Sequence, residues 1–433
     1  MEDRLLGTSL MLDKHPLRGE TLKKRQRYID ALSYGIGAEE TAQHSKDVLD
    51  LYRRTLIPED NYIAKPAPWL TSIFKYRYVL YLDVLFIAAF NNANEGKTLA
   101  KRMEQCIPKV NRRKLWQLYN RLYKNEVSCS FRFAEAQIHI WKENQRFAEL
   151  ALTKVVFTAN MSAGKSTLIN AIVGKRVNKS QNDACTAKLH YIFNKPLEDG
   201  FVAEDDNVYN LDADHYSLMT DDVSNANNTI KVGTYFRSSY LSQHRLCIID
   251  TPGVNSSTDE THRSITEESL SNEDGYTLVY VINGESMGTD DEHRYMAYLS
   301  NMNKNCPIVF VVNKVDRFKR DEDSIADSLQ QIKKDVVQAG FKNALVLPVS
   351  ANAGLLAKIK LAGDRLSEDD IDELDVLERK FRRAEYNLLQ FFPLDVQKKK
   401  KKIVETHYSP EDKKYIQLLL NCGILGVEQI LIQ

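Results

Sequence analysis

The chain has 433 residues, about three times the ~150 residues of a typical domain, so two or three domains are expected. Its 59 basic and 59 acidic side chains cancel, which argues against a general nucleic-acid binder and against an acidic tail protein. Hydrophobic residues at 43% and charged residues at 27% exclude disordered and collagen-like classes. The six cysteines form no CxxC pair and no signal peptide is recognised, so zinc and disulfide frameworks are not expected and a reduced cytoplasm is the expected location.

Residues 1–150 show helical periodicity and no catalytic motif. The most apolar stretch, Val79–Phe90, contains Asp83 and is too short for a bilayer, which needs ~20 residues, so a buried core helix is expected there. We therefore expect a helical N-terminal domain, neck-like or partner-binding. Its helices are expected at Thr21–Ser33, Glu39–Leu56, Trp69–Phe90, Asn111–Lys124 and Phe131–Leu150.

From Thr153 onward, β-branched runs alternate with helical patterns. Helices are expected at Asp290–Leu299 and Asp323–Ala339, and the chain becomes charged and helical again after Asn352. This alternation predicts an α/β fold with a mostly parallel, doubly wound sheet. The expected strands are Lys154–Thr158, Lys188–Phe193, Arg245–Ile249, Thr277–Ile282, Ile308–Val312 and Ala344–Pro348.

The segment Ala159-Asn-Met-Ser-Ala-Gly-Lys-Ser-Thr167 lies between a predicted strand and a predicted helix. This is the arrangement of a phosphate-binding loop, with Ala159 in place of the first glycine. Loop amides would face the phosphates, Lys165 would reach the β- and γ-oxygens, and the Ser166 hydroxyl would bind Mg²⁺. The residues expected to contact the nucleotide here are Ala163, Gly164, Lys165, Ser166 and Thr167.

Three further motifs follow strands. Leu246–Gly253 ends a strand in Asp250, which would hold Mg²⁺ through water, and the Gly253 amide would sense a γ-phosphate. In Asn313-Lys-Val-Asp316, the Asp316 carboxylate would accept two hydrogen bonds from guanine and the Lys314 stem would lie across the base. In Ser350-Ala351, the Ala351 amide would meet guanine O6. Each motif alone is also compatible with an ordinary polar strand end.

The four motifs occur in the order phosphate loop, Asp-x-x-Gly, Asn-Lys-x-Asp and Ser-Ala, each at the carboxyl end of a predicted strand. Ligands of open α/β sheets bind at that edge. Together they predict a protein that binds GTP and GDP with Mg²⁺.

The order and the residues of these motifs resemble those of the GTPase domain of the dynamin-like large GTPases, especially bacterial members. The resemblance rests on Ser162–Ala171, on Cys185-Thr186-Ala187 and on the closing segment Asn421–Leu431. It implies that Thr186 binds Mg²⁺ and positions the attacking water, and that Ser162 is the family's catalytic phosphate-loop serine. It also implies a bound monovalent cation and a homodimer across the nucleotide face.

The resemblance divides the chain into four parts. A helical domain is expected at 1–150, a dynamin-type GTPase domain at 151–355, a helical insertion at 356–415 and the last helix of the GTPase domain at 416–433. The 64 residues from Thr186 to Asp250 favour a large GTPase over a small regulatory one. Val254 stands where Ras-type enzymes carry a water-orienting Gln, so hydrolysis must be organised by other groups.

The expected activity is GTP hydrolysis by in-line attack of water on the γ-phosphate. Three uses of it stay open: membrane remodelling by a dynamin-like enzyme, a regulatory switch of the Era or septin kind acting on a protein or RNA, and a scaffold with slow hydrolysis. The partners expected are a second copy, a second dynamin-like subunit or a peripheral membrane, without specific nucleic acid. The run Lys398–Lys402 is compatible with anionic lipid, nucleic acid or simple solvation. Asp290–His293 is expected to be an acidic helix start rather than a metal site.

Overall fold

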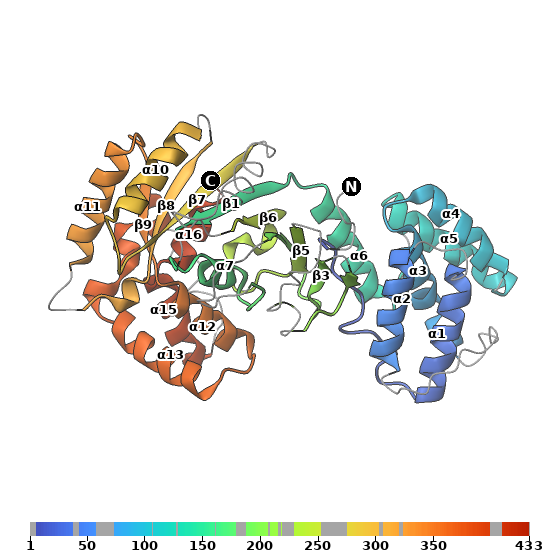
Figure 1. The fold of residues 1–433 in the computed structure, drawn as a ribbon. Helices are drawn as coiled ribbons and strands as arrows, with labels where there is room; N and C mark the ends of the chain where they lie inside the picture. Colours follow the sequence, from blue (N-terminus) through green and yellow to red (C-terminus); the bar gives the residue numbers. More distant parts are fainter. Residues whose placement is uncertain are drawn as a thin grey trace. The chain divides into compact units, whose positions relative to one another are not determined.

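A computed structural model gives the fold, which divides into two compact units (Figure 1). The helical unit comprises Met1–Leu150 with Pro196–Glu204 and Val208–Ala213; the sheet unit comprises Ala151–Lys195, Asp205–Asn207 and Asp214–Gln433. The residues that the structure describes are 6–37, 43–57, 73–105, 107–126, 129–160, 162–178, 188–206, 208–214, 218, 229–252, 275–302, 306–319, 324–398 and 409–432.

The helical unit is organised around α3 (Arg77–Ala89), which is buried along almost its whole length. This confirms the core helix expected from the apolar run Val79–Phe90. α3 follows the short helix η2 (Phe74–Tyr76) and contacts all of the other helices of the unit. Those helices are α1 (Leu22–Ile36), α2 (Gln43–Leu56), α4 (Ala93–Gln105), α5 (Lys109–Tyr123) and α6 (Glu135–Ala148).

Asp83 on α3 is fully buried, and three side chains of the same unit donate to it. His15 Nε2 lies 3.0 Å from Asp83 Oδ2, and the hydroxyls of Tyr28 and Tyr52 lie 2.5 and 3.4 Å from its two oxygens. The Leu17 amide donates to His15 Nδ1 at 3.3 Å, so the imidazole proton sits on Nε2 and points at the carboxylate. A buried carboxyl group needs hydrogen-bond partners, and this cluster explains why an apolar helix carries an aspartate.

Within the described residues, the sheet has nine strands in the order β4-β3-β5-β2-β6-β1-β7-β8-β9. All neighbouring pairs from β6 to β9 are parallel, β2 pairs with β5 in parallel, and β2 runs antiparallel to β6. This confirms the mostly parallel α/β fold. The strands are β1 (Thr153–Ala159), β2 (Leu189–Asn194), β3 (Ala203–Asp206), β4 (Val208–Asn210), β5 (Thr229–Thr234), β6 (Leu246–Asp250), β7 (Tyr276–Asn283), β8 (Ile308–Asn313) and β9 (Leu345–Pro348).

The register of the parallel strands brings their carboxyl ends to one edge. Phe157 pairs with Asp250, Asn283 with Asn313, and Val312 with Pro348. The motif-bearing turns after β1, β6, β8 and β9 therefore leave the sheet at the same edge, where open α/β sheets bind ligands.

Helices flank this sheet, and α12 packs against both α7 and α15 (Figure 1). α10 begins at Asp290 with three acidic residues in its first turn, which confirms the expected acidic helix start. The closing segment is broken, because Gly423 at φ 84° separates α15 from α16. The helices are α7 (Lys165–Val173), α10 (Asp290–Met302), α11 (Ile325–Gln338), α12 (Ala351–Ala362), α13 (Glu368–Phe381), α15 (Pro410–Asn421) and α16 (Ile424–Ile430), with short turns η3 (Tyr240–Gln243), η4 (Val315–Arg317), η5 (Ala384–Tyr386) and η6 (Leu388–Phe391).

Some elements carry little sequence signal. The expected helices do not include α4, which contains Gly96, a poor helix former. A Cβ at Gly96 would lie 2.6 Å from the Tyr123 ring, so close packing against that ring requires the glycine. Strand β3 reads Ala-Glu-Asp-Asp, and acidic residues are depleted in strands. None of the described helices has the length and apolarity that crossing a bilayer requires.

Candidate functional site

The phosphate loop lies between β1 and α7, as the sequence predicts. Ser162 and Gly164 both have positive φ, 59° and 81°, so the backbone turns sharply before α7 starts at Lys165. A Cβ on Gly164 would collide with the Asn313 amide, so only glycine fits there. Ser166 and Thr167 lie in the first turn of α7, where the unpaired amides of a helix N-terminus favour an anion.

Lys165 forms an ion pair with Asp250, the last residue of β6. Asp250 is fully buried and Lys165 is 7% exposed, so the pair is shielded from water. The second carboxylate oxygen of Asp250 accepts a hydrogen bond from the side-chain Nδ2 of Asn178. The two motifs that the sequence placed at the phosphate end are therefore in direct contact.

These side chains fit the magnesium ion that a GTPase uses. Mg²⁺ prefers hard oxygen ligands and is commonly held by one or two protein groups beside substrate phosphates. The Asp250 carboxylate and the Ser166 hydroxyl are such groups, and Lys165 and Asn178 already orient the carboxylate. The third expected ligand, Thr186, lies outside the described residues, as do Gly253 and Val254.

At the other end of the site, the Asn313 side chain links the phosphate loop to the Ser-Ala motif. Its Nδ2 donates to the carbonyl oxygens of Ala163 at 3.0 Å and Gly164 at 3.3 Å. Its Oδ1 accepts from the Ala351 amide at 3.0 Å. Asn313 is 2% exposed, so these bonds form in a nearly dry environment and hold three separate segments together.

Asp316 lies on η4, and its carboxylate contacts the Ser350 hydroxyl. The Ser350 hydroxyl donates to Asp316 Oδ1 at 2.6 Å and accepts from the Ala353 amide at 3.3 Å, which caps α12. The Asp316 side chain is only 6% exposed. The hydrogen bond from Ser350 therefore connects the two motifs that were expected to read the base.

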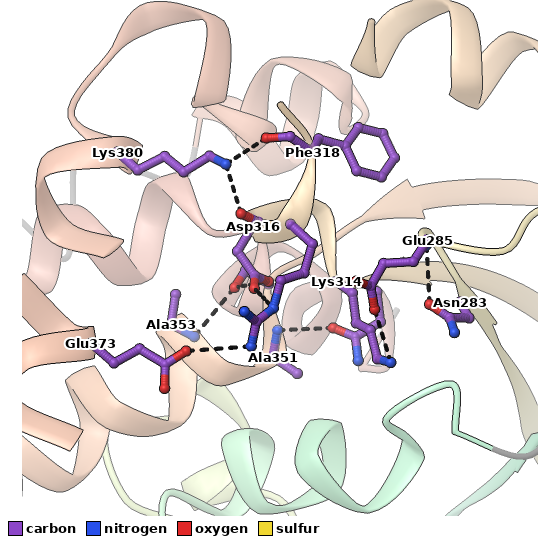
Figure 2. A network of polar contacts seen from close by, with 12 residues as sticks. Asn283, Glu285, Lys314, Asp316, Phe318, Ala351, Ala353, Glu373 and Lys380 are labelled. Atoms are coloured by element: carbon purple, nitrogen blue, oxygen red, sulfur yellow. Dashed lines mark hydrogen bonds and ion pairs between the residues drawn. The ribbon is translucent and has the colours of Figure 1, made fainter. Parts of the chain in front are cut away.

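Lys314 has the left-handed conformation, at φ 64°, at the start of this turn. Its ammonium lies 3.2 Å from the Glu285 carboxylate, which the turn after β7 presents (Figure 2). The Asn283 side chain shapes that turn by accepting from the Glu285 amide at 3.0 Å. The ion pair with Glu285 fixes the end of the Lys314 side chain. Its aliphatic stem is the part that is expected from the sequence to cover the base.

A buried cysteine borders the site without contributing a nucleophile. The Cys422 carbonyl accepts from the Ser350 amide at 2.9 Å, which places the residue beside the Ser-Ala motif. Burial raises the pKa of the Cys422 thiol to about 12. The thiol is therefore protonated at neutral pH and does not act as a thiolate.

Sequence reasoning missed Asn178 and Glu285. Asn178 follows α7 by five residues, and the Asn170 side chain fixes it by accepting from its amide at 2.9 Å and donating to its carbonyl at 2.7 Å. Both asparagines lie close to the phosphate loop in the sequence, so a search of the residues that follow the loop could have found Asn178. Glu285 had no such signal, because its contact with Lys314 depends on the pairing of β7 with β8.

The parallel sheet, the phosphate loop after its first strand and the polar motifs at the neighbouring strand ends define a P-loop GTPase domain. Residues 155–315 match the model described as "Dynamin family". Over these residues the chain is similar to the dynamin family, which agrees with the resemblance drawn from the motifs.

Known proteins share this domain at low identity. The Arabidopsis thaliana protein named "Probable transmembrane GTPase FZO-like, chloroplastic" is 27% identical over 51% of this chain and 21% of its own length. Dynamin-like protein A of Bacillus subtilis is 24% identical over 53% of this chain and 19% of its own length. The chain thus spans about a fifth of these curated relatives. A solved structure of "an oligomerised bacterial dynamin pair" has a TM-score of 0.39 at 12% identity, covering 92% of this chain and 63% of that one.

Proposed function

We propose that this chain hydrolyses GTP with Mg²⁺, which Ser166 and Thr186 would hold directly and Asp250 through water. The observation that carries the proposal is the convergence of Lys165, Asp250, Asn313, Asp316 and Ser350 at one edge of the sheet. The dynamin-family match of residues 155–315 supports the same reaction.

The phosphate half of the site stabilises negative charge on the γ-phosphate as water attacks. Lys165 leaves Asp250 to contact the β- and γ-oxygens, and the amides of Ala163, Gly164 and Thr167 surround them. Gly253 contributes an amide near the γ-phosphate, and Ser162 lies at the loop's turn beside the reacting group. When bound, Mg²⁺ neutralises charge on the phosphate oxygens.

The base half of the site selects guanine. Asp316 accepts from the ring N–H and the exocyclic amine, a donor pair that adenine lacks, and Ala351 donates to O6. The Lys314 stem covers one face of the ring. Ser350 and Asn313 support this arrangement, since they already hold Asp316 and Ala351 at 2.6 and 3.0 Å.

The catalytic groups are completed by a second copy of the chain. Val254 cannot orient water as a glutamine does, so this role falls to the phosphate loop with Ser162, to Thr186 and to a monovalent cation ordered when two nucleotide faces meet. We place the dimer at a membrane surface, where the protein would bind peripherally, a proposal supported by the relative named as a probable transmembrane GTPase.

GTP turnover per molecule, measured against protein concentration with ATP as the control, tests the reaction. Rising specific activity is expected, because the dimer completes the site. Flat, low activity would contradict activation by dimerisation, and a preference for ATP would contradict the role of Asp316. Lys165→Ala should abolish turnover and weaken GTP binding; unchanged turnover would refute the site.

Co-sedimentation with liposomes tests the membrane part separately. Pelleting of the protein with anionic vesicles, stronger with a non-hydrolysable GTP analogue than with GDP, is the expected result. Absence of pelleting across several lipid mixtures would favour the regulatory or scaffold alternatives, in which a protein or RNA is the partner.

A further inference from the structure

Helix α13 reaches the turn that carries Asp316. Lys380, near the end of this helix, donates from Nζ to the main-chain carbonyls of Asp316 and Phe318, both at 2.6 Å (Figure 2). These carbonyls flank the last residue of η4, so one ammonium group binds both sides of the turn. No motif in the sequence pointed to this lysine, which lies 64 residues beyond Asp316.

Neighbouring side chains hold Lys380 in this position. Its Nζ lies 4.5 Å from the centre of the Tyr386 ring, and the Tyr386 hydroxyl donates to the same Phe318 carbonyl at 3.2 Å. Near the start of α13, Asp370 forms an ion pair with Arg176 at 2.9 Å. The helix α13 is therefore held at both ends. Its start is tied to the segment that follows α7, and its end is tied to the η4 turn that carries Asp316.

The turn needs this support because its own bonds are few. η4 is a single short turn that starts from the left-handed Lys314. Its described internal backbone bonds are Arg317 N to Lys314 O at 3.0 Å and Phe318 N to Val315 O at 3.2 Å, and Val315 N also donates to Val349 O at 3.3 Å. Both carbonyls accept from outside the turn: Phe318 O from Lys380 and Tyr386, and Asp316 O, among the described bonds, from Lys380.

We propose that Lys380 is a positioning residue for guanine selection. It fixes the backbone from which the Asp316 carboxylate meets the exocyclic amine of the base, while Ser350 fixes the carboxylate itself. This inference rests on the proposed function, since it assumes that Asp316 reads guanine.

Inosine nucleotides provide the readout, because hypoxanthine lacks the exocyclic amine but is otherwise the same base. The affinity ratio of GDP to IDP reports how well Asp316 is placed, whereas a general loss of stability lowers both affinities together. In the unaltered protein this ratio should be about tenfold or more, the scale of one hydrogen bond to a charged group.

The test compares the GDP-to-IDP affinity ratio of the unaltered protein with that of Lys380→Met, measured by competition against a fluorescent guanine nucleotide. Lys380→Met should lower the ratio by about threefold or more, and Lys380→Arg, which keeps a donor, should restore most of it. Arg379→Met is the matched control, since Arg379 bonds only to the Asp375 carbonyl of its own helix among the bonds described, at 3.1 Å. It should leave the ratio unchanged.

The possible results separate the role of Lys380 from that of Asp316. A folded Lys380→Met protein with an unchanged ratio overturns the role of Lys380. If Lys380→Met does not fold, Lys380→Gln takes its place, because its side chain is neutral and shorter than the one that reaches both carbonyls, and an unchanged ratio in that variant would overturn the proposal. If the unaltered protein itself does not prefer GDP over IDP, the proposed function fails instead.

Discussion

Asn313 and Ala163 are joined by a 3.0 Å hydrogen bond between the end of β8 and the phosphate loop. Because the other end of the same amide accepts from Ala351, one buried side chain sets the spacing between the phosphate-binding and base-reading halves. A nucleotide that spans both halves needs this spacing to be fixed before it binds, since preorganisation lowers the cost of binding.

Asn313→Asp should therefore weaken guanine-nucleotide binding strongly. The new carboxylate can still accept from Ala351, but its second oxygen faces the carbonyls of Ala163 and Gly164 where a donor stood. Losing such bonds in a buried site costs about 1–3 kcal/mol, which is about fivefold to 150-fold in affinity. The dissociation constant of a fluorescent GDP measures it.

Asn194→Ala is the matched control for that experiment. Asn194 is also buried and holds backbone groups, donating to the carbonyls of Leu241, Ser242 and His244, but it lies at the end of β2, away from Asp250. Its loss should lower the melting temperature without changing GDP affinity in the folded protein. Equal effects of the two substitutions on affinity would contradict the linking role of Asn313.

Asn178→Leu should raise the Mg²⁺ concentration that nucleotide binding requires. The Asn178 amide donates to one oxygen of Asp250, and leucine of similar size leaves that oxygen without this donor. A carboxylate that is less well oriented binds its metal more weakly, about tenfold or more when an orienting partner is lost. The release rate of fluorescent GDP, titrated with Mg²⁺ and with EDTA, gives the half-saturating concentration.

The prediction is specific to the metal. At saturating Mg²⁺ the variant should release GDP at nearly the rate of the unaltered protein, and in EDTA the two proteins should behave alike. A difference that persists in EDTA would mean that Asn178 acts on the fold of the loop and not on Asp250.

Local patterns predicted the site residues, and long-range contacts supplied the rest. Lys165, Asp250 and Asp316 were recognisable because their motifs lie at or just after the ends of strands, and parallel pairing brings those strand ends together. Glu285 and Lys380 were not recognisable, since their partners are fixed by packing and not by spacing. The acidic strand β3 was missed for a related reason, because its neighbours in the sheet override its composition.

Lys358 and Glu428 form a fully buried ion pair at 2.5 Å between α12 and α16, and breaking it should be costly. Burial lowers the pKa of Lys358 and raises the pKa of Glu428, so the pair is held by mutual contact against desolvation. Lys358→Met leaves Glu428 without its partner and should lower the free energy of unfolding by about 3–5 kcal/mol. Urea unfolding followed by circular dichroism measures the change.

The double variant Lys358→Met, Glu428→Gln identifies the cause. Glutamine is neutral and can still accept from the Tyr240 amide, which lies 2.9 Å from Glu428. More than half of the lost stability should return. Lys413→Met, the same change at an exposed site on α15, should alter stability by less than about 0.5 kcal/mol. A double variant no more stable than Lys358→Met would attribute the loss to packing and not to the unpaired charge.

Glu292 should make the fold less stable as pH rises toward neutrality. It is 5% exposed, and burial raises the pKa of its carboxyl to about 7, with Asp335 adding to the rise while the Gly288 amide and His293 oppose it. Between pH 4.5 and 7 the folded protein therefore holds a proton that the unfolded chain releases. The free energy of unfolding should fall across this window by roughly 3 kcal/mol from this group alone.

Glu292→Gln isolates that contribution, because the amide oxygen can still accept from the Gly288 amide, now at 3.0 Å, and carries no charge. The variant should match the unaltered protein near pH 4.5 and exceed its stability by roughly 3 kcal/mol at pH 8. Carboxyls whose pKa is lowered, such as Asp50 and Glu135, act in the opposite sense, but at lower pH and equally in both proteins. The comparison of the two proteins cancels the contributions of these carboxyls. Parallel curves of stability against pH from 5 to 8 would contradict the prediction. They would mean that Glu292 is ionised in the folded protein and that contacts other than those described offset its burial.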